Sequence, residues 1–269
     1  MEKGKLIGEG RTSEVFEWGE DKILKLFRSG LPKTAIKNEY KVSINIYNQL
    51  NLTPKVYELI EIDNRSGIVY ERINGITMMK IISSKPWKVK KEAQRLAELH
   101  KSIQKKVNFK LSTNKTRLKD NISNTELLTY DIKTRLYNYI DELKDDNILC
   151  HGDFHPDNIL ITKDGEIIID WMTATQGNPL TDIARTSIMF KFGVVPNKTF
   201  PEKQIINLIR NKFYLEYIKH YLKLTRVKIE QIEQWELPVA AARLTEWLPK
   251  EEKNALLNFI DKKMETLKI

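Results

Sequence analysis

The hydrophobic pattern changes its period near residue 75, and this change constrains the fold of the chain more than any other feature. Before it, short β-prone runs are separated by turns, most of which contain glycine. These runs are residues 5–10, 13–19, 22–27, 55–62 and 67–73. After Asn74–Gly75 the apolar residues recur mostly at helical spacing. The pattern predicts an α+β protein with a β-rich lobe, residues 1–74, and a larger α-helical lobe, residues 75–269.

One helix is predicted inside the β-rich lobe, beginning near Pro32. Its apolar stripe consists of Ile36, Tyr40, Ile44, Tyr47 and Leu50. In the second lobe, two stripes predict further helices. They are Val89, Ala93, Leu96, Ala97 and His100, and then Leu128, Ile132, Leu136, Tyr139 and Leu143.

The rest of the second lobe contains one predicted hairpin and a helical C-terminal region. The apolar runs 159–161 and 167–170 flank a Lys-Asp-Gly turn, which is typical of a hairpin. Helices resume near Thr181, and prolines are predicted to break them. These prolines are Pro196, Pro201, Pro238 and Pro249.

Composition narrows the class of protein. The 269 residues are 41% hydrophobic and 30% charged, which is typical of a folded globular chain. We expect no membrane partner, because no apolar run is long enough to span a bilayer. The charged N-terminus predicts no signal peptide. Cys150 is the only cysteine, which excludes an intrachain disulfide and a Cys-based zinc site and favours a buried role for this residue. These features predict a cytoplasmic protein.

The net charge of +9 favours anionic partners in general. It is uneven, since residues 101–120 hold seven Lys or Arg and one acid. Solvated helix faces and a nucleic-acid groove would both explain this stretch. No nucleic-acid-binding signature accompanies it, so we expect solvated helix faces and no nucleic-acid partner.

A glycine-rich turn lies between the first two predicted strands. It contains Gly8, Gly10 and Ser13. Glycines let backbone N–H groups approach a phosphate closely, and a serine hydroxyl adds a donor. Such turns are also common in hairpins, so the turn alone decides nothing.

Lys25 lies in the apolar strand 23–27. A half-buried lysine costs desolvation unless an anion partners it, and Glu39 on the following helix is a candidate partner. Paired in this way, the ammonium group would be oriented toward nucleotide phosphates. A second interpretation stays open, since Lys25 faces away from both Leu24 and Leu26 and would then point to solvent.

The strongest motif is HGDFHPDNIL, residues 151–160. Asp153 and Asn158 are five positions apart, and Asp170 follows an apolar strand. Phosphoryl transfer needs a carboxylate that orients the acceptor and oxygen ligands that hold Mg²⁺ against nucleotide phosphates. This spacing lets one loop present Asp153 to a hydroxyl and Asn158 to a metal, which Asp170 would also bind.

This motif, followed by IIDW at residues 168–171, resembles the aminoglycoside phosphotransferase and choline kinase family, whose fold is similar to that of protein kinases. His151, Asp153 and Asn158 match the kinase catalytic loop, with Gly152 in place of its arginine. Further matching segments extend the resemblance over most of the chain, and it weakens after about residue 190. They are Gly8–Gly10, Lys25, Glu39, residues 70–73, 96–100 and 178–184.

The resemblance implies a bilobal protein-kinase-like fold and an ATP- or GTP-dependent small-molecule kinase that requires Mg²⁺. Asp153 would be the catalytic base, and Asn158 and Asp170 the magnesium ligands. Asp182 would brace the catalytic loop by accepting backbone hydrogen bonds. The implied nucleotide-binding residues are Gly8, Gly10, Ser13, Lys25, Glu39, Glu71 and Ile73.

Two other functions remain open at this stage. A metal-dependent hydrolase would use the alternating ligands His151, Asp153, His155 and Asp157. Pro156 argues against the extended segment that this site needs. A non-catalytic nucleotide-binding pseudokinase would keep the fold without transfer.

We expect the acceptor to be a small molecule that carries a hydroxyl group. A cationic acceptor would need carboxylates or aromatic faces, which the pairs Trp235–Glu236 and Glu246–Trp247 offer. Our candidates for acceptor binding are Asp157, Glu236, Glu246 and Trp247. The same tryptophans would also suit a core, and the same glutamates a solvated surface.

Overall fold

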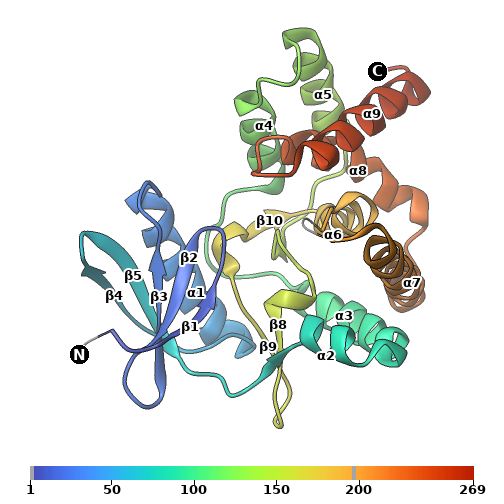
Figure 1. The fold of residues 1–269 in the computed structure, drawn as a ribbon. Helices are drawn as coiled ribbons and strands as arrows, with labels where there is room; N and C mark the ends of the chain where they lie inside the picture. Colours follow the sequence, from blue (N-terminus) through green and yellow to red (C-terminus); the bar gives the residue numbers. More distant parts are fainter. Residues whose placement is uncertain (1–2, 196–197) are drawn as a thin grey trace. The chain divides into compact units, whose positions relative to one another are not determined.

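The computed structural model describes residues 3–195 and 198–269. Their contacts form two compact units. Unit 1 is the described part of Met1–Lys80 together with Pro156–Thr173, and unit 2 is Ile81–His155 together with Ala174–Ile269. Unit 1 is built on a sheet and one long helix, and unit 2 is mainly helical (Figure 1), which confirms the predicted α+β class. The lobe boundary after residue 74 stays a prediction.

Unit 1 contains a five-stranded antiparallel sheet in the order β1-β2-β3-β5-β4. The strands are β1 Leu6–Glu9, β2 Ser13–Glu17, β3 Lys22–Phe27, β4 Val56–Ile62 and β5 Arg65–Glu71. All five were predicted from short β-prone runs. The β4–β5 turn places Asp63 and Asn64 at positive φ, which these residue types tolerate better than most.

Helix α1, Lys33–Leu50, covers one face of this sheet. The helix itself was predicted, but its buried face was not. The buried residues are Ile36, Glu39, Val42, Ser43 and Ile46, whereas Tyr40, Ile44, Tyr47 and Leu50 are only half-buried. The prediction counted apolar residues alone. Glu39 and Ser43 are buried because polar partners from the sheet meet them there.

A second sheet in unit 1 has the order β6-β8-β9. Its strands are β6 Ile76–Thr77, β8 Ile159–Ile161 and β9 Glu166–Ile168, so the predicted hairpin at 159–170 is present. The amide of Ile168 donates to the carbonyl of Leu52, 2.7 Å away, just after α1. This bond ties the hairpin to the main helix of the unit.

Unit 2 is built from helices around the short antiparallel pair β7 Ile148–Cys150 and β10 Thr175–Gly177. The helices are α3 Val89–Ile103, α4 Asn114–Asn124, α5 Tyr130–Glu142, α6 Leu180–Phe192, α7 Phe200–Thr225, α8 Ile229–Arg243 and α9 Lys250–Leu267. Helix α2, Met78–Ser84, crosses the boundary between the units. The stripe predicted for α3 is entirely buried. In Figure 1, α6 lies between α7 and α8, which it contacts.

The prolines behave differently from one another. Pro201 lies in the first turn of α7 and Pro249 precedes α9, so both mark helix starts. Pro196 lies outside the described residues. Pro238 is inside α8, so the predicted break there is wrong. A proline cannot donate to the carbonyl four residues earlier, and the Tyr139 hydroxyl donates to that carbonyl, on Gln234, at 3.0 Å instead.

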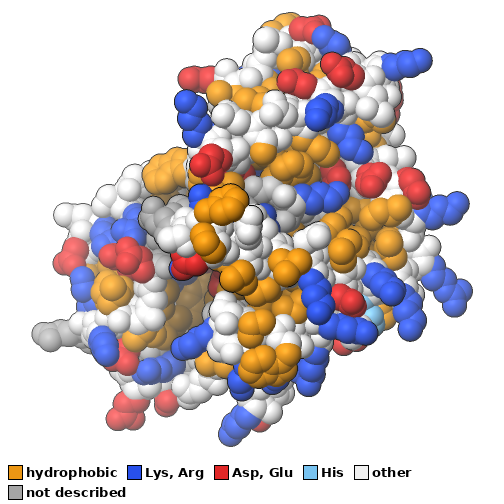
Figure 2. Space-filling view, turned by 45° about the vertical axis from the view of Figure 1, so that its right-hand side comes forward, with side chains coloured by type: hydrophobic (Ala, Val, Ile, Leu, Met, Phe, Trp, Pro, Cys, Tyr) orange, Lys and Arg blue, Asp and Glu red, His pale blue; other side chains and the backbone are white. Residues whose placement is uncertain are grey.

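Three further predictions concern the exterior and the cysteine. Cys150 is 2% exposed, and burial raises the pKa of its thiol well above the ordinary value. Among the described residues, every helix falls short of the length and apolar character that crossing a bilayer requires. On the face shown in Figure 2, Lys and Arg side chains are mixed with Asp and Glu.

Candidate active site

Lys25 is held between two carboxylates of unit 1. Its ammonium nitrogen lies 2.6 Å from Glu39 Oε1 and 3.0 Å from Asp170 Oδ1. Lys25 shares its face of β3 with Phe27, and this face packs on α1, so the lysine does not point to solvent. Burial lowers the pKa of Lys25, but the charges of Asp170 and Glu39 outweigh burial and raise it above its ordinary value. The lysine is therefore permanently charged at neutral pH.

Tyr70 holds Glu39 in place, and Ser43, which the sequence did not single out, contacts Tyr70 in turn. The Tyr70 hydroxyl donates to Glu39 Oε1 at 3.2 Å and lies 3.4 Å from the Ser43 hydroxyl. Glu39 is 1% exposed, so these partners offset part of the cost of burying a carboxylate. Ser43 lies four residues after Glu39 on α1, a spacing that places both on one helix face.

Asn158 and Asp170 are brought together by the second sheet of unit 1. Asn158 ends a short 3₁₀ turn before β8, and Asp170 follows β9. The amide of Ile169 donates to the carbonyl of Asn158 at 3.0 Å, which extends the β8–β9 pairing by one step. Asp170 has a φ of 65°, which turns the chain out of the strand, and its side chain is 38% exposed.

These two side chains suit magnesium. A carboxylate and an amide oxygen are hard ligands of the kind that Mg²⁺ takes, with nucleotide phosphates and water completing its shell. The pairing of β8 with β9 keeps their backbones adjacent. The residues present therefore fit the metal that the sequence predicts.

The glycine-rich turn connects β1 to β2, and the Gly10 amide donates to the Ser13 carbonyl at 2.8 Å. A Cβ at Gly8 or Gly10 would meet its nearest neighbour at 3.5 or 3.7 Å, ordinary contact distances. The local fold therefore does not require glycine at either position. A ligand that approaches the backbone would require it. Ser13 is 6% exposed at the start of β2.

The predicted adenine-binding segment follows directly from β5. The Glu71 amide donates to the Lys55 carbonyl at 2.9 Å, and the Glu71 carboxylate accepts from the Lys55 amide at 3.1 Å. The Ile73 carbonyl accepts from the Gly75 amide at 3.1 Å. The backbone at Glu71 is thus fixed by bonds to Lys55, just before β4, and that at Ile73 by a local turn.

In unit 2, the loop after β7 carries Asp153. Gly152 has a φ of 79°, a conformation that favours glycine and turns the chain sharply. The Asp182 carboxylate on α6 accepts from the amides of His151 at 2.6 Å and Gly152 at 2.8 Å. This is the bracing role that was predicted for Asp182.

Side chains from three helices complete the support of this loop. The His100 ring on α3 packs at a tilt against Phe154, with ring centroids 4.1 Å apart, and its Nε2 lies 3.1 Å from the Asp182 carboxylate. Its Nδ1 lies 2.7 Å from the hydroxyl of Tyr217 on α7. The Thr186 hydroxyl on α6 donates to the Phe154 carbonyl at 2.8 Å. His100 is therefore a core histidine with partners, as expected from its helix face.

Asp153 itself lies beside an arginine and a histidine. Arg185 on α6 donates to Asp153 Oδ1 at 3.3 Å, and His155 Nε2 lies 3.3 Å from Asp153 Oδ2. Burial raises the pKa of Asp153, but the hydrogen bond from His155 and the charge of Arg185 outweigh burial and hold the pKa well below the ordinary aspartate value. The carboxylate is thus ionised at every physiological pH. Sequence reasoning missed Arg185, whose only local signal is a charge on an apolar helix.

The acceptor candidates are placed in very different surroundings. Glu236 is 1% exposed and lies 2.6 Å from Lys191, and Trp235 is part of the core. Glu246 accepts from Arg185 at 2.6 Å. Trp247 is 85% exposed, and Asp157, in unit 1, is exposed as well.

The described residues do not support the hydrolase site. In the part of the chain that the structure describes, no group of three or more His, Cys, Asp or Glu side chains is arranged to hold a metal ion. His151 Nδ1 accepts from the Asp153 amide at 3.2 Å, and His155 contacts the Asp153 carboxylate. Both histidines brace the loop.

Comparison with known protein families agrees with this geometry. The model of the phosphotransferase enzyme family matches residues 3–204, which is more than half of the chain. The chain belongs to this family. The match includes Lys25, Asp153, Asn158 and Asp170 and ends before α8 and α9, so Glu236, Glu246 and Trp247 lie beyond it.

Solved structures of phosphotransferases share the fold. Choline kinase LicA from Streptococcus pneumoniae is 17% identical, with a TM-score of 0.61 over 97% of this chain and 92% of that one. The aminoglycoside phosphotransferase APH(4)-Ia is 14% identical, with a TM-score of 0.63 over 97% and 91%. The streptomycin–ATP–APH(2")-IIa ternary complex is 13% identical, with a TM-score of 0.58 over 97% and 91%. No curated protein sequence shows significant similarity to the chain.

These likenesses confirm the predicted fold. The protein has the protein-kinase-like architecture of the choline kinases and aminoglycoside phosphotransferases, with a small β-rich part and a larger helical part. At these identities the comparison says nothing about the substrate. The family membership supports phosphotransfer to a small molecule as the general activity.

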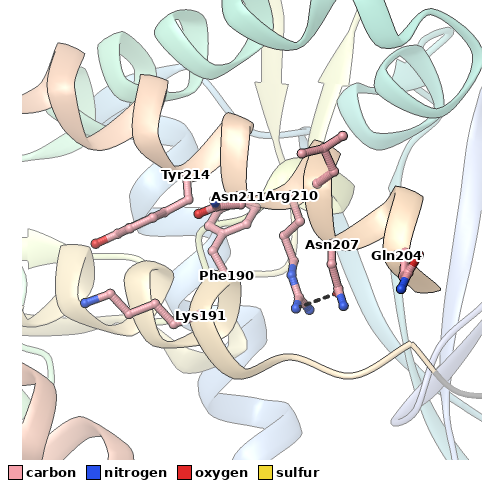
Figure 3. Close-up of a pocket in the computed structure, with 8 residues that line it drawn as sticks. Phe190, Lys191, Gln204, Asn207, Arg210, Asn211 and Tyr214 are labelled. Atoms are coloured by element: carbon pink, nitrogen blue, oxygen red, sulfur yellow. Dashed lines mark hydrogen bonds between the residues drawn. The ribbon is translucent and has the colours of Figure 1, made fainter.

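Unit 2 also has an open hollow of about 700 Å³ between α6 and α7. Figure 3 shows Phe190 and Lys191 of α6 opposite amide side chains, Arg210 and Tyr214 of α7. Arg210 donates to Asn207 and to the Gly193 carbonyl, and Lys191 pairs with Glu236. Among the described residues, no carboxylate lines this hollow, so this lining offers no group to activate an acceptor hydroxyl.

Proposed function

We propose that the protein transfers the γ-phosphoryl group of ATP or GTP to the hydroxyl group of a small acceptor. The observation that carries this proposal is the cluster in which Lys25 contacts both Glu39 and Asp170. Kinases of this fold use such a lysine and carboxylates to position nucleotide phosphates and their metal. A cluster of this kind has no evident purpose in a purely structural unit, because buried charge is costly.

We assign the nucleotide to residues of unit 1. The backbone of Glu71 and Ile73 would hydrogen-bond the base, and Gly8, Gly10 and Ser13 would border the phosphates. Lys25, oriented by Glu39, would contact the α- and β-phosphates. Asn158 and Asp170 would hold Mg²⁺, which neutralises charge on the transferred group.

We assign the acceptor hydroxyl to Asp153. Its carboxylate is ionised, because Arg185 and His155 hold its pKa low, and its loop is fixed by Asp182. A strongly ionised carboxylate is a weak base, so its main contribution is to orient the hydroxyl and to accept its proton late in transfer.

The test compares Asp153→Asn and Asp170→Asn in a nucleotide-consumption screen. The acceptors are aminoglycosides, choline, ethanolamine, sugars and hydroxy amino acids. Asp153→Asn should reduce transfer by about 10²–10⁴-fold and leave Mg-nucleotide binding nearly unchanged. Asp170→Asn should weaken Mg-nucleotide binding itself. Asp164→Asn, at the exposed tip of the β8–β9 hairpin, is the matched control and should change neither.

Lys25→Met and Lys22→Met form a second matched pair on the same strand. Lys25→Met should weaken nucleotide binding, whereas Lys22, which lies over the exposed Tyr57 ring, should be replaceable. Native transfer rates in Asp153→Asn and Asp170→Asn would refute the assigned roles. Nucleotide binding without transfer to any acceptor would favour a pseudokinase.

A further inference from the structure

The basic stretch 101–120 contains one cation that differs from its neighbours on α4. Lys115 donates to the Asp141 carbonyl at 3.2 Å, and Lys119 pairs with the Asp141 carboxylate at 2.6 Å. Both act as surface lysines with α5, as the sequence predicts. Arg117, between them, lies on a different side of the helix and is half-buried.

The position of Arg117 follows from the packing of α4 on α8 and from side-chain bonds between the start of α4 and the start of α6. The Asn114 side-chain amide donates to the Asn178 carbonyl at 2.9 Å and to the Thr181 hydroxyl at 3.1 Å. Arg117 lies one turn after Asn114, and Arg185 lies one turn after Thr181, so each shares a helix face with the residue in this contact. The two guanidinium groups are therefore neighbours, and they repel each other.

Arg117 has no counter-ion of its own. Within residues 3–195 and 198–269, no hydrogen bond or ion pair joins its guanidinium to another side chain. Burial and then the charge of Arg185 lower its pKa to about 10, while Glu246 and Asp153 attract it only from a distance. The group is still charged at neutral pH. A cation in these surroundings is stabilised when an anion binds it.

The carboxylates nearby are already paired. Glu246 is bonded to Arg185 at 2.6 Å and to Arg243 at 3.3 Å, and Arg243 also donates to Glu252 at 2.9 Å. Glu236 is buried against Lys191. Two of the carboxylates proposed for a cationic acceptor are thus occupied by cations of the protein itself.

We infer, given the function proposed above, that the acceptor is an anionic alcohol. Its hydroxyl group meets Asp153, and its carboxylate or phosphate group binds Arg117. The guanidinium fork suits either anion, because both offer two oxygens in one plane. Arg185 stays with Asp153 and Glu246 and adds positive potential without leaving its partners.

The experiment uses acceptors matched in their carbon skeleton. One arm compares a hydroxy acid with its neutral amide and with the corresponding amino alcohol. The other compares a sugar phosphate with the parent sugar. In the arm that contains the correct anion, the anionic member should have the highest kcat/KM.

Variants at Arg117 then locate the effect. Arg117→Met should raise KM for the anionic acceptor by about 10–100-fold, leave kcat within a few fold and leave nucleotide affinity unchanged. Arg117→Lys should restore part of the loss, which a purely structural role would not produce. Lys119→Met removes the same charge two residues away, on a different side of the helix, and controls for long-range effects.

The failure of this inference is distinguishable from failure of the proposed function. If neutral or cationic acceptors are phosphorylated best, or if Arg117→Lys and Arg117→Met keep the native KM, the anionic acceptor is refuted and the kinase stands. If the protein neither binds nor consumes nucleotide, the kinase itself is refuted and the inference with it. The acceptor ranking of the native protein decides the matter even if Arg117→Met does not fold.

Discussion

The charged cluster around Lys25 in unit 1 and the one around Asp153 in unit 2 are built in opposite ways. In unit 1, one lysine is shared by two carboxylates, Glu39 and Asp170. In unit 2, the carboxylates of Asp153 and Glu246 already have arginine partners, whereas Arg117 has no ion-pair partner among the described residues. The first cluster can therefore bind a cation through a carboxylate, and the second can bind an anion through the guanidinium group of Arg117.

The supports of the clusters differ as well. The Asp153 loop is held by backbone amides that point at a fully buried carboxylate, so its shape does not depend on a ligand. The Lys25 cluster is held by side-chain ion pairs, and Asp170 is partly exposed. We expect the loop of unit 2 to be rigid and the contact between Lys25 and Asp170 to rearrange when a metal binds.

The largest expected effect comes from Asp182→Asn. Replacing one carboxylate oxygen by an amino group places an N–H donor opposite a backbone N–H donor of the loop. It also leaves His100 without its carboxylate partner. The free energy of unfolding should therefore fall by about 3–5 kcal/mol. Chemical denaturation measures this change, and Asp164→Asn is the control. Native stability in Asp182→Asn would show that the loop is not held by this carboxylate.

The same variant has a signature in pH. Burial raises the pKa of Asp182, but His100 and the loop amides outweigh it and hold the pKa below the ordinary value. Such a group stabilises the fold above the unfolded-state pKa of about 3.9, and this contribution is lost as the pH falls through the folded-state pKa. The loss of stability on acidification should therefore be smaller in Asp182→Asn than in the native protein.

A smaller effect is expected from Arg185→Gln, which should change the pKa of the proposed catalytic base, Asp153. Without the guanidinium, burial of Asp153 is opposed only by the histidines nearby, so the pKa of Asp153 should rise. Transfer requires the ionised form, so the acidic limb of kcat/KM should move to higher pH. In the native protein we expect this limb below the ordinary aspartate range. An unchanged pH profile would show that Arg185 does not set the pKa of Asp153. Arg135→Gln, at an exposed position, is the control.

The smallest effect is expected from removing the hydrogen bond that supports Glu39 in unit 1. Tyr70→Phe removes the hydroxyl that donates to Glu39 and should cost about 1.5 kcal/mol of stability, since a buried carboxylate loses a hydrogen bond. Tyr40→Phe, whose hydroxyl is 3.5 Å from a carbonyl at the exterior, should stay within about 0.5 kcal/mol. Equal losses in the two variants would mean that Tyr70 contributes no specific support.

Sequence patterns predicted the parts of this molecule whose signals are local. The five strands, the hairpin and the helix starts follow from short-range periodicity and turn residues, and the motif at 151–160 contains its chemistry in ten letters. The resemblance to a known family then supplied the bracing role of Asp182. In each case the relevant residues lie close together in sequence or in a familiar order.

Long-range pairing set the limit of prediction. Arg185 and Glu246 are 61 positions apart, and no local pattern around either residue predicts that they pair. Glu39 and Ser43 lie on the buried face of α1 because Lys25 and Tyr70 face them. A count of apolar residues therefore placed this face off its centre, with Ile36 buried and the rest of the predicted stripe only half-buried. Pro238 was predicted to end a helix. The Tyr139 hydroxyl, which donates to the Gln234 carbonyl in place of the missing proline amide, lies 95 residues from that carbonyl in the sequence, so no local pattern reveals it.

The burial of Cys150 has a practical consequence for spectroscopy. A thiol that is 2% exposed and protonated at neutral pH reacts slowly with maleimide or iodoacetamide reagents. Cysteines introduced at solvent-exposed sites, one on the β-sheet unit and one on the helical unit, would therefore carry a fluorophore pair without prior removal of the native one. Energy transfer between the dyes, recorded with and without nucleotide, would follow domain motion in an otherwise unaltered chain.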